Sequence, residues 1–403
     1  MELMSIGKFA KRVGVNVVTL ATKIRLKPTK EQEILFWKSA GTARWAYNYF
    51  LAESERIYND EKRTVKEGEV RKKINNELKP TTHKWLQEVG SNVMKQAVKD
   101  ADIARKRWFI GMTEKPRFKS RRRSKVSFYV NYESLKRTNE GFRGEKIGIV
   151  KTCNALPKLK KGHKYSNPRI SFDGRNWFLS IGYEQEFEPF DVTGESLGID
   201  VGIKKLAVCS DGEFKKNINK TKEVKRLEQK LKREQRQLAR KLEANTKAYT
   251  KERKPIYKIP LKNMKNVQKQ NAKIRNLYKR LNDIRTNHLH QCSNEIVKTK
   301  PSRIVMEHLN VKGMMKNKHL AKAVSGQKLY EFKRQIQYKC EKYGINFVEA
   351  DRWFPSSKTC SSCGQIKTDL KLKDRLYICS CGLKLDRDLN ASINLANYSI
   401  KGI

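Results

Sequence analysis

The sequence predicts a mixed α/β protein assembled from α-rich, β-rich and α/β parts. Its 403 residues are enough for two or three domains. Apolar residues follow a helical period through 30–115, whereas short alternating strands, separated by Gly- and Lys-rich turns, fill 116–190. From 191 onward, apolar strands occur together with a long charged helical stretch and a final short helix. These three patterns define the parts that are justified in turn below.

The charge balance predicts a polyanionic partner. The chain has 89 Lys and Arg against 42 Asp and Glu, a net charge of +47, and a pI near 10.0. Such an excess repels itself in a compact state, so RNA or DNA is expected to offset it, and an ordinary small-molecule enzyme is disfavoured. No run approaches the roughly 18 apolar residues of a membrane span. Met1 leads into a polar, basic stretch and not a signal peptide, so a cytoplasmic, reducing location is expected for the eight cysteines.

The first residues, 1–17, form a separate leader. Ser5 to Val15 has the pattern of a short amphipathic helix with a Gly stop and resembles the opening of a MerR-type helix-turn-helix. That resemblance ends near Leu20. The alternative interpretation is that the segment is left over from upstream coding sequence and does not bind a DNA groove. Residues 19–27 then alternate as a β-strand, and Pro28-Thr29 ends it. Thr29 and Gln32 form a capping box for the helix that follows.

The next two segments are a helical region, 30–115, and a strand region, 116–190. The helical pattern breaks near Lys79-Pro80, and most of its aromatic residues are expected in a core, with a minority as stacking surfaces for bases. The strand region has the spacing of a small β-barrel, and the strand near Thr19 is able to pair with it. The clearest strands are Val126 to Tyr132, Ile147 to Val150, Arg169 to Phe172 and Trp177 to Tyr183.

Residues 216–290 predict a basic helical hairpin. They contain 24 Lys and Arg and 6 Asp and Glu, a net charge of +18. Two apolar stripes at 3-4 spacing lie on either side of a link that contains Pro255 and Pro260. The hairpin is either a solvated antiparallel coiled coil or a basic arm along a phosphate backbone. The two interpretations are compatible, because the apolar stripes can pack together while the basic faces point outward.

Four cysteines near the C-terminus predict a zinc site. They form a C-x2-C pair and a C-x-C pair, and a glycine that suits a tight turn, Gly364 or Gly382, follows each pair. Four thiolates fill a tetrahedral Zn²⁺ site, so one structural ion is expected. The alternative is a reduced, partly disordered loop. The ligands are Cys360, Cys363, Cys379 and Cys381; the isolated thiols are Cys153, Cys209, Cys292 and Cys340.

Acidic residues at strand and helix ends predict a second metal site. Asp200 lies in an apolar strand, Glu307 ends another, and Asp386 and Asp388 open the last helix. Such acids could pair with Lys or Arg, but carboxylates are also the preferred ligands of Mg²⁺ or Mn²⁺. Two such ions about 4 Å apart could activate a water and stabilise the leaving oxygen in phosphodiester cleavage. No phosphate-cradling G-x-x-x-x-G-K-[ST] motif is present, which argues against an ATP-driven motor.

Six segments together resemble TnpB, a family of transposon-encoded nucleases of bacterial insertion sequences related to type V CRISPR effectors. They occur in the order of that family over about residues 20–400, with the leader and the short C-x-C pair as departures. The segments are Lys23 to Thr29, Ala43 to Asn48, Leu197 to Leu206, Met306 to Leu309, Phe354 to Cys360 and Asp386 to Ala391.

The resemblance implies a fold for each segment. It implies an RNase H-like RuvC nuclease domain with an inserted zinc ribbon, a wedge β-barrel, and a helical recognition domain inserted into the barrel. The segments are the MerR-like leader (1–17), the two wedge parts (18–29 and 116–190), the recognition domain (30–115), the nuclease domain (191–355, with the hairpin 216–290, and 385–403) and a target-binding zinc ribbon (356–384).

The resemblance also implies residue roles. Asp200, Glu307 and Asp388 would be the catalytic acids and the magnesium ligands, with Asp388 favoured over Asp386. The segment Trp85 to Gln96 resembles the recognition helix of the family. Its candidates for contacting a short DNA motif are Ser91, Asn92, Lys95 and Gln96.

The expected function is RNA-guided cleavage of double-stranded DNA beside a short transposon-adjacent motif, because base pairing reads the remaining target. The partners would be a guide RNA from the transposon end and the target DNA, with one protein copy per RNA, acting at the bacterial nucleoid. The alternatives are a nuclease-inactive, guide-directed repressor of the same family and, from charge alone, a ribosomal or general RNA-binding protein.

Overall fold

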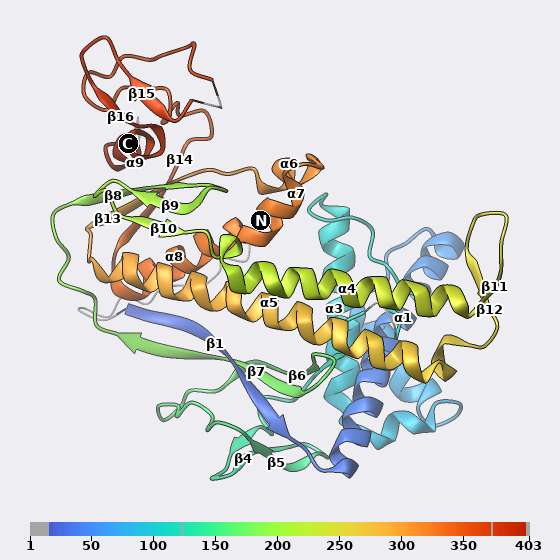
Figure 1. Ribbon diagram of the computed structural model, residues 1–403. Coiled ribbons are helices and arrows are strands. Elements are labelled where there is room, and N and C mark those ends of the chain that lie inside the picture. The colour runs from blue at the N-terminus through green and yellow to red at the C-terminus, as the bar shows by residue number, and fades with distance from the viewer. Residues whose placement is uncertain (1–15, 122–123, 372–373, 400–403) are drawn as a thin grey trace. The chain divides into compact units, whose positions relative to one another are not determined.

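The computed structural model describes residues 16–121, 124–371 and 374–399 (Figure 1). The leader predicted for residues 1–17 lies outside the described residues except for its last two positions. The chain divides into two compact units, of which the first contains 19–185 and the second contains 186–399 together with 16–18. None of the helices described is both long enough and apolar enough to cross a bilayer.

The first helix of the first unit begins where the capping box predicts. Thr29 Oγ1 accepts a hydrogen bond from the Gln32 amide at 3.3 Å, and the Thr29 amide donates to Gln32 Oε1 at 3.1 Å. The turn at 79–83 matches the predicted break. The helices are α1 (Lys30–Glu61), α2 (Glu67–Lys73), the π-helical turn η1 (Ile74–Leu78), the 3-10 turn η2 (Lys84–Glu88) and α3 (Ser91–Phe109).

The strands of the first unit form one seven-stranded sheet in the order β2-β6-β7-β1-β5-β4-β3. β1 pairs antiparallel with β5, which confirms that the early strand joins the later ones. The outer strands β2 and β3 are not paired with each other in the described ranges, so closure into the predicted barrel is not seen. The strands are β1 (Asn16–Lys27), β2 (Ser127–Tyr129), β3 (Lys136–Arg137), β4 (Gly141–Gly144), β5 (Gly148–Thr152), β6 (Ser166–Phe172) and β7 (Trp177–Phe187).

Aromatic side chains join α1 to this sheet. The ring of Phe36 lies 5.1 Å from that of Trp177 and 5.8 Å from that of Phe128, centroid to centroid, and all three are buried. Offset and edge-on rings at such separations pack favourably. Trp45 and Tyr49 stack at 5.2 Å and are only partly buried. Trp37, Tyr58, Trp85 and Phe109 are exposed, and few aromatic residues of the helical region are buried, so the expectation that most of them are core residues is wrong.

The second unit is built on a five-stranded sheet in the order β10-β9-β8-β13-β14. The first three strands form an antiparallel meander, and β13 runs parallel to both β8 and β14. Gly212, with φ of +88°, makes the predicted turn between β9 and β10. The strands are β8 (Ser196–Val201), β9 (Lys205–Cys209), β10 (Phe214–Lys216), β13 (Arg303–Glu307) and β14 (Asn346–Ala350).

Helices cover both faces of this sheet. Alternate residues of a strand point to opposite faces. Leu197 and Ile199 therefore share a core with α5 (Lys265–Lys298) and α8 (Leu329–Tyr343), while Gly198 packs against α9 (Arg387–Ala396) on the other face. Shorter elements complete the unit: α6 (Val311–Lys316), α7 (Ala321–Gln327), β15 (Leu376–Ile378) and β16 (Lys384–Asp386).

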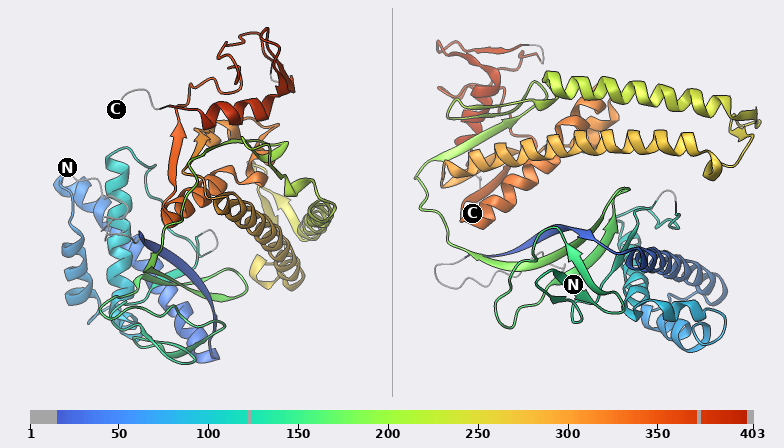
Figure 2. Two further views of the ribbon diagram at one scale, coloured as in Figure 1. Left: turned by 90° about the vertical axis from the view of Figure 1, so that its left-hand side faces the viewer. Right: turned by 60° about the horizontal axis from the view of Figure 1, so that its bottom comes forward.

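The basic hairpin has the predicted form. α4 (Lys222–Ala244) and α5 lie side by side in both views of Figure 2, joined by a link with a two-stranded ribbon, β11 (Thr246–Tyr249) and β12 (Pro255–Tyr257). The two predicted stripes pack together, with Leu227 and Leu231 of α4 against Ile274 and Leu281 of α5. Eight cations of α4 are exposed: Lys222, Lys225, Arg226, Lys230, Lys232, Arg233, Arg236 and Arg240. The hairpin is thus an antiparallel helix pair with an outward basic surface.

Gly198 sets the distance between β8 and α9. A Cβ at this position would lie 1.9 Å from the Ser392 carbonyl oxygen and 2.4 Å from the Ala396 amide nitrogen, both backbone atoms that cannot move separately. We expect Gly198→Ala to push α9 from the sheet and lower the free energy of unfolding by about 3 kcal/mol, the upper range for overpacking. Denaturant unfolding measures this change. Gly202→Ala is the control, because its Cβ would make an ordinary 3.6 Å contact, and equal losses in both variants would contradict the prediction.

Candidate carboxylate site and metal centre

The register of two parallel strands brings Asp200 and Glu307 to one end of the sheet. The pairing of β8 with β13 aligns Arg303 with Ser196 and Met306 with Ile199. Asp200 and Glu307 are the next residues of β8 and β13, so they lie next to each other just past the end of the paired segment. Asp200 has the same parity as Gly198 and therefore points to the face that α9 covers. The carboxyl ends of these strands thus form one side of the site.

α9 runs antiparallel to β8 and adds Asp388 to this end. At the other end of the sheet, the Ala396 carbonyl accepts hydrogen bonds from Ser196 Oγ and from Arg303 Nη2, both at 2.8 Å. The close contact of Gly198 with Ser392 lies midway. Four helical residues rise about 6 Å and two strand residues about 6.6 Å. One further turn of α9 therefore brings Asp388 level with Asp200.

Asp386 has a different environment. Its Oδ1 atom accepts hydrogen bonds from the amides of Asp388 and Leu389 at 3.0 and 3.2 Å, so this carboxylate is the N-cap of α9. The Asp388 side chain, by contrast, lies 3.7 Å from the Arg387 guanidinium. The structure therefore gives the two acids different partners.

Burial raises the pKa of two of these acids, and neighbouring acids add to the shift of one. Burial, followed by the neighbouring charges of Glu307 and Asp388, raises the pKa of Asp200 well above its usual range, and Arg387 opposes the shift. Burial raises the pKa of Glu307 to about 7. Bringing acids together in a desolvated place is costly unless a cation offsets their charge. The donor set therefore fits a hard divalent cation. Not all three carboxylates approach within 4.8 Å of one another, so side-chain rotation would be needed for them to share one ion.

His308 lies beside the carboxylate end but faces another acid. Its Nδ1 atom is 2.5 Å from Glu349 Oε1 on β14, and Lys333 Nζ contacts the same oxygen at 2.7 Å. This ion-pair group ties β13, β14 and α8 together. His308 therefore has its partner outside the three acids.

The four predicted cysteines come together. Among the residues that the structure describes, they are the one set of three or more Cys, His, Asp or Glu whose ligand atoms all lie within 4.8 Å. The Sγ atoms of Cys360 and Cys381, and of Cys363 and Cys379, are 3.6 Å apart. A tetrahedral zinc with Zn–S near 2.3 Å needs sulfurs about 3.8 Å apart. A disulfide would need about 2.05 Å. The set therefore fits a structural zinc ion.

The backbone around the cysteines has the predicted turns. Gly364 and Gly382 adopt φ of +76° and +94°, and their amides donate to the carbonyls of Cys360 and Cys379 at 2.9 and 3.1 Å. These are the left-handed positions that glycine favours. A hydrogen bond from the Cys381 amide lowers the pKa of the Cys379 thiol, whereas the pKa of the Cys363 thiol is raised because it shares hydrogen bonds with the other three cysteines. Among the remaining cysteines, Cys153 is exposed, and Cys209, Cys292 and Cys340 are buried without forming such a set.

Two asparagines that the sequence analysis missed connect the cysteine site to α9. Asn390 Nδ2 and Asn394 Nδ2 both donate to the Thr359 carbonyl at 2.7 Å, directly before Cys360. Asn390 Oδ1 also accepts from the Ser361 amide at 3.0 Å. The detectable signal was their i, i+4 spacing, which places two amides on one face of a helix. Through them the cysteine loop supports the helix that bears Asp388.

The candidate motif-contacting residues lie along the first turns of α3. Ser91, Asn92, Lys95 and Gln96 are all partly exposed, and Gln96 donates to Asp100 Oδ1 at 2.9 Å. A cavity of about 670 Å³ lies beside this helix, but Val93, Ala97 and Asp100 line it instead of those four. The structure thus separates the predicted residues from the adjacent cavity.

Basic side chains around that cavity were also missed. Arg169 forms a bidentate pair with Asp100 at 2.8 and 2.9 Å, and burial lowers the pKa of Lys119, whose Nζ lies 3.6 Å from the Tyr47 ring centroid. Asn48 and Lys119 exchange two hydrogen bonds through the Asn48 amide. The segment Ala43 to Asn48, which the sequence already singled out, contributes to one side of this cavity. Arg169 reaches the cavity only through the fold.

The sequence of this chain is similar to those of known proteins. Three family profiles match, described as "Probable transposase" (residues 180–318), "Cas12f1-like, TNB domain" (330–395) and "Helix-turn-helix domain" (16–63). A Streptomyces pristinaespiralis protein named "Putative RNA-guided DNA endonuclease" is 31% identical over 385 residues, which cover 94% of this chain and 89% of that protein. The chain belongs to the TnpB family. A "TnpB-like protein L79" of Acanthamoeba polyphaga mimivirus is 32% identical over 35% of this chain and 28% of its own.

One of the profiles and one solved structure can be compared with the fold of this TnpB-family chain. The segment matched by the helix-turn-helix profile consists here of β1 and the long helix α1. A solved structure described as "Structure of the mini-RNA-guided endonuclease CRISPR-Cas_phi3" aligns with a TM-score of 0.46 at 9% identity, over 95% of this chain and 92% of that one.

Proposed function

We propose that this TnpB-family chain is an RNA-guided endonuclease that cuts double-stranded DNA beside a short transposon-adjacent motif. The observation that carries the proposal is the convergence of Asp200, Glu307 and Asp388 at one end of the β8-β13 ladder. The names of the relatives support the substrate class. Three strands in an antiparallel meander followed by two parallel strands also support an RNase H-like, RuvC-type nuclease domain.

The three acids would hold two Mg²⁺ or Mn²⁺ ions, and these ions, when bound, supply water activation and stabilisation of the leaving oxygen. Asp200 and Glu307 would contribute from the strand ends, and Asp388 from the first turn of α9. Arg387 and the packing of α9 on Gly198 would hold the carboxylates in place. The residue types fit because hard oxygen ligands suit these cations.

The other parts would share the work of binding nucleic acid. A guide RNA from the transposon end would lie on the basic surfaces, with one protein copy per RNA, while pairing reads the target. The sheet of the first unit would be the wedge, and α1 to α3 the recognition domain. Within α3, the candidates for the DNA motif remain Ser91, Asn92, Lys95 and Gln96, and the ribbon of residues 356–384 would contact the target.

The experiment is to purify the protein from its native locus, sequence the RNA bound to it, and supply a matched plasmid with Mg²⁺. We expect one enriched RNA from the transposon end and cleavage of the plasmid. Target binding without nicking in Mg²⁺ or Mn²⁺ would instead indicate a guide-directed repressor. The absence of any enriched RNA from the locus would return the general RNA-binding protein as the better account.

The basic surface of the hairpin predicts a salt-dependent share of RNA affinity. We expect a single variant with four substitutions to give a flatter plot of log RNA affinity against log salt concentration. It replaces Lys230, Arg233, Arg236 and Arg240 together by Gln. Removing one phosphate contact lowers the steepness of this plot by about 0.7 to 0.9. These side chains are exposed, so the melting temperature should not change. An unaltered slope would show that the hairpin is only a scaffold.

A further inference from the structure

A second cavity lies within the first unit, between the C-terminal halves of α1 and α3 and the chain that follows α3. Its volume is about 530 Å³, within the range of sites that hold small ligands. All its lining residues fall within 51–118, so it is formed by the helical region and the three residues that follow it. Neither the three carboxylates nor the four cysteines contribute to it, and the proposed cleavage does not use it.

The walls of this cavity carry exposed aromatic rings. Tyr58, Phe109 and Phe118 are each more than half exposed, at 54%, 55% and 57%. Trp108 packs beside Phe109 with ring centroids 4.8 Å apart. Four aromatic rings around one opening are more than packing of the unit requires, because large apolar rings gain free energy when something flat covers them. The cavity therefore presents ring faces and edges to a ligand.

The charge around the rings is positive. Four cationic residues line the cavity, against Glu55 as the acidic one. Lys115 Nζ lies 5.8 Å from the Trp108 ring centroid and 2.9 Å from Glu55, and Arg117 pairs with Glu114 at 3.3 Å between highly exposed side chains. Such exposed pairs are weak and are exchanged easily for a phosphate. The four cations are Arg63, Arg105, Lys115 and Arg117.

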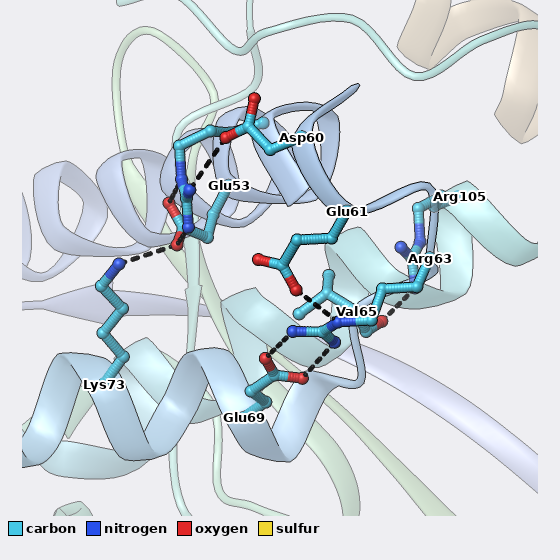
Figure 3. Close-up of polar contacts among 9 residues, drawn as sticks. Glu53, Asp60, Glu61, Arg63, Val65, Glu69, Lys73 and Arg105 are labelled. Atoms are coloured by element: carbon cyan, nitrogen blue, oxygen red, sulfur yellow. Dashed lines mark hydrogen bonds and ion pairs between the residues drawn. The ribbon is translucent and has the colours of Figure 1, made fainter. Parts of the chain in front are cut away.

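Two of these cations are held by the fold. Figure 3 shows Arg63 between Glu61 and Glu69, with the closest contacts at 2.6 and 2.7 Å, and Arg105 donating to the Val65 carbonyl at 2.6 Å. Arg105 also donates to Asp102 at 2.9 Å and lies under the Phe50 ring. These contacts fix one side of the cavity, which leaves Lys115 and Arg117 as the cations able to follow a ligand.

Two buried polar atoms of the lining have no hydrogen-bond partner within the described chain. They are Ser54 Oγ and Arg105 Nε, and both residues are only 7% exposed. Buried polar groups are nearly always paired in folded proteins, and an exception calls for an explanation. Both atoms are shielded from solvent, so they mark an unsatisfied polar spot in the wall behind the cavity and are not themselves open to it.

We propose that this cavity binds one unpaired nucleotide of an RNA strand. The base would stack on the rings, and the phosphate would lie near Lys115 and Arg117. Stacking on aromatic side chains is how unpaired RNA bases are bound. RNA is favoured over DNA because the neutral side chains of Asn59 and Thr64 at the same opening suit a ribose 2′-hydroxyl. The inference rests on the proposed function only for the presence of RNA.

The test uses the full chain and a short oligouridylate in which one base is 4-thiouridine. After photo-crosslinking, mass spectrometry should locate the RNA on peptides that contain Tyr58, Trp108 to Phe109, or Phe118. Phe118→Ala should weaken crosslinking by about tenfold, as expected when one stacking ring is removed. Tyr132→Ala is the matched control, because Tyr132 is an exposed ring of the same unit outside the cavity. Lys115→Gln with Arg117→Gln should weaken binding without altering any ring.

Three outcomes would overturn the proposal. One is crosslinking spread over the basic hairpin and unchanged in both cavity variants. Another is equal crosslinking at the same peptides by the matching oligodeoxyuridylate, which would remove the preference for RNA. The last is a self-associating protein that becomes monomeric in Phe118→Ala, which would assign the rings to a protein interface. If the unsubstituted protein crosslinks at the cavity but does not cleave DNA, the proposed nuclease activity is refuted and the cavity assignment stands.

Discussion

Replacing Asp200 with asparagine is expected to lower the rate of guide-directed DNA cleavage by at least about 1,000-fold. Asparagine keeps the size of the side chain but removes the charge at the end of β8 that would hold a divalent cation. Bound metal stabilises transition-state charge by several kcal/mol, and about 4 kcal/mol corresponds to three orders of magnitude. Single-turnover cleavage of a matched plasmid in Mg²⁺ measures the loss, with RNA and DNA binding followed in parallel.

The two acids at the start of α9 supply a matched pair of controls. Asp388→Asn should fail in the same way as Asp200→Asn. Asp386→Asn should keep most of the activity, because asparagine caps a helix as well as aspartate does and Asp386 is engaged by the amides of Asp388 and Leu389. Full activity in Asp200→Asn, or loss in Asp386→Asn with retention in Asp388→Asn, would show that the carboxylates are assigned wrongly.

Short-range signals in the sequence predicted much of the local structure. The Thr29 and Gln32 cap, the turns at Gly364 and Gly382, and the apolar stripes of the hairpin each depend on residues close in sequence. Their physical causes, a hydrogen bond to a nearby amide, a positive φ and a helical period, act within a few residues. For this reason they could be identified before any tertiary contact was known.

Contacts between distant segments were less accessible. That Asp388 lies level with Asp200 depends on the direction of α9 across β8, which Gly198 and the Ala396 carbonyl determine and no local pattern encodes. The aromatic cavity joins Ser54 of α1 with Phe118 beyond α3 in the same way. Residues whose roles depend on packing between remote elements therefore had to await the fold.

The second large effect is expected at the cysteines. Wild-type protein should contain close to one Zn²⁺ per chain by elemental analysis, and Cys363→Ser or Cys379→Ser should lose it. A zinc ion contributes on the order of 10 kcal/mol to folding of small zinc-finger peptides. Among the described residues of 356–384, Tyr377 is the large side chain that is fully buried, and strands β15 and β16 are three residues each, so little besides metal orders this segment. Without metal, residues 356–384 should become the first site of proteolysis.

The loss of zinc should also reach the carboxylate site, because Asn390 and Asn394 of α9 bind the Thr359 carbonyl beside Cys360. We therefore expect Cys363→Ser to weaken cleavage as well as stability, although no cysteine touches the three acids. Cys153→Ser is the control, since Cys153 is exposed and isolated and should keep both zinc and activity. If Cys363→Ser and Cys379→Ser both retained a full equivalent of zinc, the four sulfurs would not be its ligands. If zinc were lost and cleavage unchanged, the asparagine contacts would not transmit order from the ribbon to α9.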